Sequence, residues 1–151
     1  MLEVRIAHLS IEHFPEALAL WEASVSATHH FLPEGWIEEH RLKVLNEYFP
    51  MVQMYGLFNE DNELMGFSGV LNQNLEMLFV HPKQLGKGIG STLVKHAIQK
   101  LEVNKVDVNE QNSEALTFYL NQGFQIQSRS EFDAQGNPFP LLHLSLMKNR
   151  K

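Results

Sequence analysis

Three glycines within five residues, followed by an amphipathic stretch, constrain this sequence more than any other feature. Gly86, Gly88 and Gly90 lie between an apolar segment that ends at Val80 and a helical-period stretch that begins at Ile89. Glycine lets consecutive backbone N–H groups converge, and the first turn of a helix adds unpaired N–H groups and a positive dipole end. The sequence therefore predicts a strand, an anion-binding turn and a helix, with a phosphate or pyrophosphate as the natural ligand. A purely structural glycine turn is the alternative.

Two other phosphate-binding motifs fit this turn poorly. A Walker A loop places lysine directly before serine or threonine, whereas here Ser91 directly follows Gly90. A Rossmann fingerprint follows the first strand of a doubly wound sheet, but this turn lies at mid-chain with only about 60 residues after it. The turn therefore belongs to a different α/β architecture.

Hydrophobic periodicity outlines that architecture. The expected elements are a strand over 2–9, a helix capped by Ser10, a helix over 33–46, strands over 54–58, 64–71 and 75–80, a helix over 89–101, a strand over 105–108, a helix over 113–122, and strands over about 124–132 and 139–147. Pro50 is expected to end the second helix, and Gly123 the last one. The order β-α-α-β-β-β-α-β-α-β-β predicts a mixed α/β sheet, and no repeat or linker divides it, so we expect a single domain over residues 1–151.

Composition excludes several classes of protein. The chain of 151 residues is 44% hydrophobic, enough for a sizeable core, and contains no apolar run that approaches a membrane span or a signal segment. It contains no cysteine, which excludes disulfide scaffolds, thiolate metal sites and cysteine nucleophiles. We therefore expect a soluble, unexported protein of the reducing cytoplasm that does not bind membranes.

The charge is unevenly distributed. The formal net charge is −6, which argues against a nucleic-acid partner. Residues 1–64 carry a net charge of −8 and residues 65–151 a net charge of +2. A mildly basic half suits an anionic cofactor, and an acidic half attracts a cationic substrate. Ordinary solvated helix faces would give the same pattern.

Two motifs together resemble the GNAT family of N-acetyltransferases. The first covers residues 78–82 and 85–91, and is similar to the family's acetyl-CoA loop. The second covers residues 109–115 and continues to Phe118-Tyr119 and Gly123-Phe124. The element order also matches that family's mixed sheet, so the resemblance spans essentially the whole chain. The closest similarity is to small, poorly characterised bacterial members.

The resemblance implies an enzyme that uses acetyl-CoA as co-substrate and transfers the acetyl group to a primary amine. Because the chain has no cysteine for a thiol relay, direct attack on the thioester is the expected mechanism. It assigns the cofactor contacts to Leu78, Phe79, Val80, Leu85, Gly86, Lys87, Gly88, Ile89, Gly90, Ser91, Asn112 and Tyr119. It also implies that the strands over 75–80 and 105–108 part to admit the pantetheine arm. Leu85 stands where the family usually has arginine or glutamine, which reduces side-chain help but leaves the backbone N–H groups. The alternative function is a non-catalytic acyl-CoA-sensing module on the same fold.

Acetyl transfer needs a base for the amine and a proton for the departing thiolate. Tyr119 is the candidate acid, with core packing as its alternative, and Asn112 is expected to cap its helix. Glu76 is the candidate base or amine-orienting group, since strand alternation predicts that it shares a face with Leu78. An exposed strand residue is the third reading, because the family's usual glutamate would fall at Asn74.

The turn after the first helix is the expected substrate region. His29, His30 and Phe31 lie there, where the resemblance implies a substrate pocket, and either histidine is a further candidate for the base. The acceptor is expected to be a small-molecule or peptide amine, cationic in character. No metal is expected, because the 8 histidines show no zinc-ligand spacing. The family often dimerises, so a homodimer is compatible with the resemblance.

Overall fold

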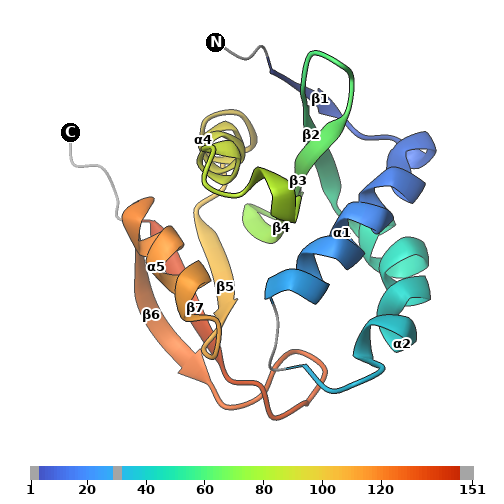
Figure 1. Cartoon of the computed structure of the whole chain (residues 1–151). Helices are drawn as coiled ribbons and strands as arrows, with labels where there is room; N and C mark the ends of the chain where they lie inside the picture. Colours follow the sequence, from blue (N-terminus) through green and yellow to red (C-terminus); the bar gives the residue numbers. More distant parts are fainter. Residues whose placement is uncertain (1–3, 29–31, 147–151) are drawn as a thin grey trace, which may run out of the picture.

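A single seven-stranded sheet organises the part of the chain that the structure describes. The computed structural model describes residues 4–28 and 32–146. The strands are β1 (Arg5–His8), β2 (Gln53–Phe58), β3 (Leu64–Leu71), β4 (Asn74–Val80), β5 (Lys105–Asn109), β6 (Phe124–Ser130) and β7 (Leu141–Leu146). They lie in the order β1-β2-β3-β4-β5-β7-β6, and neighbours are antiparallel except for β4 and β5 (Figure 1). The predicted mixed α/β order is confirmed.

Helices cover the two faces of the sheet. Helices α1 (Phe14–Thr28) and α2 (Trp36–Lys43) pack over one face, and α4 (Ile89–Leu101) and α5 (Ser113–Asn121) over the other (Figure 1). The remaining helical turns are η1 (Ile11–His13), η2 (Val44–Tyr48), α3 (Phe49–Met51) and η3 (Pro82–Gln84). Among the described residues, no helix is long and apolar enough to cross a membrane.

The parallel pair β4 and β5 opens soon after it forms. Asn74 pairs with Lys105 and Leu75 with Val106, and the pairing of these two strands stops there. Both strands nevertheless continue, β4 to Val80 and β5 to Asn109 (Figure 1). The expected parting of the two strands is therefore confirmed. It leaves part of β4 without a partner on that side.

A bulge interrupts β4 at the candidate base. Across from β4, neighbouring residues of β3 pair with Leu75 and Met77, which leaves Glu76 as the extra residue. Leu75 and Leu78 both pack against the core under α4 and α5, although three positions separate them. The alternation expected for an unbroken strand therefore fails here. Glu76 lines a cavity together with Met77 on the α1 side, so the expectation that Glu76 and Leu78 share one face was wrong.

The second helical segment runs further than its proline predicts. The expected end near Asn46 is wrong, because helical turns continue through η2 and α3 to Met51. Pro50 lies in the first turn of α3, where a backbone N–H has no intrahelical acceptor, so proline loses no helical hydrogen bond there. The preceding element, η2, is a π-helical turn that leads directly into α3. Phe49 is fully buried and meets the rings of Phe14 and Phe67 with centroids 5.3 and 5.6 Å away. Burial of this aromatic side chain outweighs the local proline signal.

The last two strands are shorter than expected. β6 ends at Ser130 and β7 starts at Leu141, so the connecting loop is longer than a tight hairpin. Pro138 and Pro140 fall in this loop and cannot donate to a strand ladder, which explains the late start of β7. The loop instead closes on itself, because the Asp133 N–H donates to the carbonyl of Asn137 at 3.0 Å.

Candidate active site

A cavity of about 470 Å³ occupies the opening between β4 and β5. Its walls are Ser24, Leu78, Phe79, Val80, Gln84, Leu85, Gly86, Gly88, Ile89, Gly90, Ser91, Asn112, Glu114, Ala115, Phe118 and Tyr119. We call it the cofactor cleft. Every residue predicted to contact the cofactor lines this cleft except Lys87. The structure thus brings the two sequence motifs, which residues 92–108 separate in the chain, to one place.

The glycine turn leaves its backbone open to the cleft. Gly86 and Gly88 have φ angles of +80° and +81°, which side chains rarely adopt. A Cβ atom added to either would meet no atom within 4 Å, so the space beside both residues is free. Gly90 has a different role, because a Cβ there would lie 3.3 Å from the ring of Phe118. Two glycines therefore expose the backbone of the turn, and the third allows α4 and α5 to pack closely.

The side chains at the start of the turn are only partly available to a ligand. Leu85 is 54% exposed and offers no polar group. Lys87, which does not line the cleft, donates from Nζ to Oε1 of Gln84 at 3.0 Å. Gln84 stands one position before the usual family residue and lines the cleft. Its amide and the backbone N–H groups are thus the polar groups that the start of the turn presents.

Ser91 is held in place from α5. Its Oγ accepts a hydrogen bond from Nε2 of Gln122 at 2.7 Å. A serine hydroxyl that accepts one bond still has its proton to donate, so Ser91 retains a donor for an anionic ligand. Thr92, by contrast, donates its hydroxyl proton to the carbonyl of Gly88 at 2.8 Å and stabilises the first turn of α4.

The second motif positions Asn112 and Tyr119 along α5. Asn112 caps this helix, because its Oδ1 accepts the N–H of Ala115 at 3.1 Å, as predicted. Tyr119 is 8% exposed, lies edge-on to the ring of Phe124 and also lines the cleft. Burial raises the pKa of the Tyr119 phenol well above its ordinary value. Tyr119 therefore packs in the core and remains a protonated phenol at neutral pH, and its role as the general acid stays a prediction.

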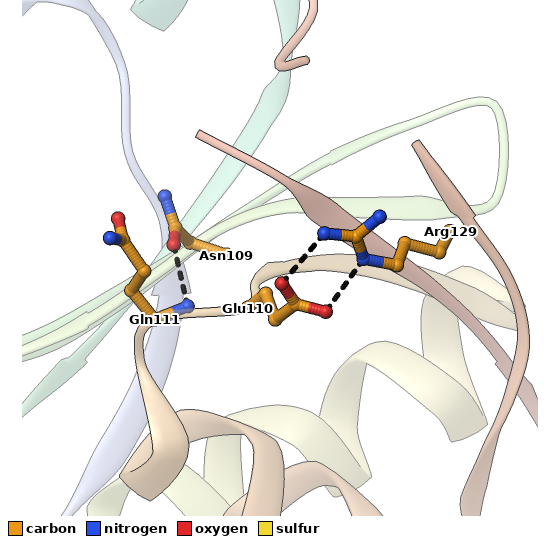
Figure 2. Close-up of polar contacts among 4 residues, drawn as sticks. All are labelled: Asn109, Glu110, Gln111 and Arg129. Atoms are coloured by element: carbon orange, nitrogen blue, oxygen red, sulfur yellow. Dashed lines mark hydrogen bonds and ion pairs between the residues drawn. The ribbon is translucent and has the colours of Figure 1, made fainter. Parts of the chain in front are cut away.

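An ion pair anchors the turn that leads into α5. Figure 2 shows the Arg129 guanidinium of β6 donating two hydrogen bonds to the Glu110 carboxylate. Nε donates to Oε2 at 2.7 Å and Nη2 to Oε1 at 3.0 Å. The Arg129 guanidinium lowers the pKa of the Glu110 carboxyl. In the same turn, the N–H of Gln111 donates to Oδ1 of Asn109 at 2.8 Å (Figure 2). These bonds fix the entry to α5, and with it the position of Asn112.

A second cavity, of about 480 Å³, lies on the α1 side of the sheet. Its walls are Trp21, Trp36, His40, Val44, Tyr48, Met51, Val52, Leu71, Glu76, Met77, Phe79, Ala134 and Gln135. We call it the aromatic chamber. The ring of His40 stacks on that of Trp36 with centroids 4.0 Å apart, and Trp21 lies 6.1 Å from Trp36. Phe79 lines both cavities, so the chamber and the cofactor cleft adjoin there.

Glu76 supplies the only carboxylate among the described walls of the aromatic chamber. Its Oε2 accepts a hydrogen bond from Nδ2 of Asn74 at 2.6 Å. Asn74, which stands where the family usually has a glutamate, thus helps to orient the Glu76 carboxylate. The Glu76 side chain is exposed, which gives it access to water. An exposed carboxylate beside aromatic rings is a suitable partner for an ammonium group.

Tyr48 and Gln135 are hydrogen-bonded to each other on the wall of the chamber, where the Gln135 amide donates to the Tyr48 hydroxyl. This bond links η2 to the loop between β6 and β7.

The predicted substrate residues His29, His30 and Phe31 lie outside the described residues, so their placement stays a prediction. The sequence assigned no site role to Tyr48, Trp21 or Trp36, because the chamber forms from segments far apart in the chain.

A polar groove of about 500 Å³ adjoins the chamber at Glu76. In it, Nδ1 of His143 lies 2.7 Å from Oδ1 of Asp107, and Nε2 lies 2.7 Å from Oγ of Ser130. Both ring nitrogens of His143 are therefore engaged by neighbouring strands. Nowhere in residues 4–28 and 32–146 do three or more histidine, aspartate or glutamate side chains come together as a metal site would require.

Comparison with known proteins decides the family. A profile described as an acetyltransferase (GNAT) domain matches residues 18–144. The chain belongs to the GNAT family. It is an N-acetyltransferase, as the resemblance implied, and the match disfavours the alternative of a non-catalytic sensing module.

Known GNAT proteins resemble the chain over most of its length. The peptidyl-lysine N-acetyltransferase YjaB of Salmonella typhimurium is 35% identical over 88% of this chain and 91% of its own. The solution structure of apo YjaB from Escherichia coli superposes with a TM-score of 0.87 at 34% identity, covering 97% of this chain and 99% of the other. PaiA N-acetyltransferase from Thermoplasma acidophilum, crystallised with coenzyme A, shares the GNAT fold with a TM-score of 0.75 at 21% identity, over 96% and 99% of the two chains.

Substitution of Gly88 tests the glycine turn. We expect Gly88→Val to abolish binding of CoA, because a β-branched residue is strained at φ +81° and fills the space beside the open backbone. Isothermal titration with CoA measures the loss. Gly136→Val is a matched control, since Gly136 has the same φ angle and equally open surroundings but lies in the loop between β6 and β7. Near-normal affinity in a folded Gly88→Val protein would remove the turn from the cofactor site.

Proposed function

We propose that this enzyme transfers the acetyl group of acetyl-CoA to the ε-amine of a lysine in a peptide or protein. The observation that carries the proposal is the aromatic chamber, which has one carboxylate among its described walls and adjoins the cofactor cleft at Phe79. The relative at 35% identity named peptidyl-lysine N-acetyltransferase supports this acceptor. The absence of cysteine fits the proposed location in the cytoplasm.

The cofactor cleft suits the extended shape of acetyl-CoA. The pyrophosphate binds the N–H groups of the glycine turn and the start of α4, with Ser91 as a further donor. The pantetheine arm continues along β4, whose backbone groups have no strand partner beyond Leu75 on the β5 side. This direction brings the thioester to Phe79, at the border of the aromatic chamber.

The aromatic chamber suits a lysine side chain. Its rings surround the four-carbon stem, and their faces attract the terminal ammonium. Glu76 attracts the ammonium and accepts a proton from it, so that a neutral amine faces the thioester. The carboxylate then passes the proton to water, which its exposed position allows.

Acetyl transfer proceeds by direct attack. The amine nitrogen forms a bond to the carbonyl carbon, and the π-electron pair moves to the carbonyl oxygen. The attacking nitrogen then carries a positive charge and loses a second proton, which Glu76 accepts after it has released the first one to water. Collapse of the tetrahedral intermediate re-forms the carbonyl and breaks the carbon–sulfur bond, and the electron pair leaves with sulfur. Tyr119 protonates the departing thiolate and regains its proton from solvent. The raised pKa of Tyr119 keeps the phenol protonated for this step.

A panel of acceptors tests the proposed function. We expect acetylation of N-terminally blocked peptides that contain lysine, and none when norleucine replaces the lysine. Thiol release and mass spectrometry of the peptide provide the readout. The rate should exceed that of a neutral or anionic amine of similar size, and the difference should shrink as salt screens the charge. Acetylation of polyamines or N-terminal amines alone would overturn the peptidyl-lysine acceptor.

The hydroxyl of Tyr119 is tested by Tyr119→Phe, which retains the ring and its packing. We expect kcat to fall by about 10–10³-fold with little change in CoA affinity, because water and the good thiolate leaving group partly compensate. Wild-type kcat should show no loss attributable to Tyr119 below pH ~10, since burial raises its pKa. Unchanged kcat in the variant, with chemistry rate-limiting, would leave Tyr119 as a packing residue.

The role of Glu76 is tested by Glu76→Gln. We expect kcat/KM for a lysine peptide to fall on the order of 10²-fold, because the ammonium loses its base. The loss should shrink as pH rises towards the ordinary lysine pKa of ~10.4, since more of the amine is then already neutral. Glu60→Gln, in the turn between β2 and β3, removes the same charge away from the chamber and should leave the rate unchanged. Equal rates for the two variants would exclude Glu76 as the base.

A further inference from the structure

Three polar side chains on neighbouring strands form a hydrogen-bonded row across the sheet. His143 is its middle member, because β7 lies between β5 and β6. Its Nδ1 lies 2.7 Å from Oδ1 of Asp107 on β5, and its Nε2 lies 2.7 Å from Oγ of Ser130 on β6. We call Asp107, His143 and Ser130 the cross-strand triad. None of the three lines the cofactor cleft or the aromatic chamber, so the acetyl transfer proposed above does not use them.

Ser130 reaches His143 because β6 carries one extra residue. That residue is Gln127, which forms a bulge opposite β7. Before the bulge, Phe124 packs against the core under α4 and α5. Side chains alternate along a strand, so without the bulge Ser130 would lie on the same face as Phe124. The irregularity instead turns Ser130 to the opposite face, where His143 projects from β7.

The partners of the imidazole set the direction of its hydrogen bonds. An ionised carboxylate only accepts, so Nδ1 of His143 donates its proton to Asp107. In the neutral ring Nε2 then carries no proton, and it accepts a hydrogen bond from the hydroxyl of Ser130. A serine bonded to a histidine that a carboxylate holds in one tautomer is the arrangement that activates a serine nucleophile.

The cross-strand triad is open to a substrate. The side chains of His143 and Asp107 are 33% and 44% exposed and line the polar groove of about 500 Å³. Ser130 is partly exposed beside it. Gln127 and Lys105 also line the groove, and their N–H groups are donors of the kind that stabilise a carbonyl oxygen as it gains negative charge. Most wall residues of the groove are polar, which suits a small ester better than a long acyl chain.

We propose that the cross-strand triad is a second catalytic site, which hydrolyses esters of short acyl groups. Oγ of Ser130 forms a bond to the acyl carbon while its proton passes to Nε2 of His143. The ester carbon–oxygen bond then breaks, and His143 protonates the departing alkoxide. Water attacks the acyl-serine and gives a proton to Nε2, which returns it to Ser130 as the acid leaves. Asp107 stays ionised throughout and is a positioning residue that holds Nδ1.

Covalent labelling gives the first test. Diisopropyl fluorophosphate phosphorylates a serine that has a base beside it, with loss of fluoride. We expect mass spectrometry to locate the label on Ser130 in the wild-type protein, and to find none there in His143→Gln. Ser128→Ala is the matched control, because Ser128 lies directly across from His143 in the sheet while the ring bonds Ser130 instead. It should be labelled like the wild type. A wild-type protein left unlabelled at Ser130 would overturn the proposal.

Hydrolysis of 4-nitrophenyl acetate gives the second test. We expect kcat to fall by about 10²-fold or more in Ser130→Ala and His143→Gln, and to stay at the wild-type value in Ser128→Ala. Asp107→Asn should lower kcat with little change in KM, because it disturbs the tautomer of the ring and not the binding of the ester. Equal rates for wild type and Ser130→Ala would overturn the proposal and leave the cross-strand triad as a structural contact between strands.

Both tests are independent of the proposed function, because they use neither acetyl-CoA nor an amine. Affinity for CoA, measured by calorimetry, reports an intact fold and should be unchanged in every variant, since the groove and the cofactor cleft have no wall residue in common. Labelling of the wild-type protein needs no variant, so it decides even where a variant fails to fold. If lysine peptides are acetylated but Ser130 is not labelled, the acetyltransferase stands and the second site is wrong.

Discussion

The parting of β4 from β5 after two paired residues is the feature on which the rest of the site depends. A parallel pair that continued would satisfy the backbone of both strands and close the sheet. Because the strands separate instead, the edge of β4 is left with backbone donors and acceptors that need a partner. In the proposed function, the extended amide-containing pantetheine arm provides one. The same opening places the N-termini of α4 and α5 around a single cleft.

In the proposed function, the sheet also separates the two reactants until they meet. The cofactor cleft is walled mainly by α4, α5 and the glycine turn, whereas the aromatic chamber is walled by α1, α2 and η2 on the other face. The two cavities adjoin at Phe79, where the strands have parted. A bulge in the same strand directs Glu76 into the chamber with Met77. One irregular strand thus provides the opening, the border and the carboxylate.

The parts predicted from sequence are those specified locally. The glycine turn, the cap at Asn112 and the order of elements each depend on residues close together in the chain, and the structure agrees with them. The bulge at Glu76 depends on pairing with β3, and the helical turns through Pro50 depend on the burial of Phe49, so local patterns mispredicted both.

The charge asymmetry of the chain has a more specific meaning in the structure than in the sequence. The acidic half, residues 1–64, supplies the aromatic rings Trp21, Trp36 and Tyr48 to the chamber, but the carboxylate among its described walls, Glu76, comes from the other half. Charges on exposed surfaces are screened beyond about 8 Å at physiological ionic strength. In the proposed function, the acidic half can therefore raise the local concentration of a cationic acceptor, whereas proton transfer from that acceptor depends on Glu76 within the chamber.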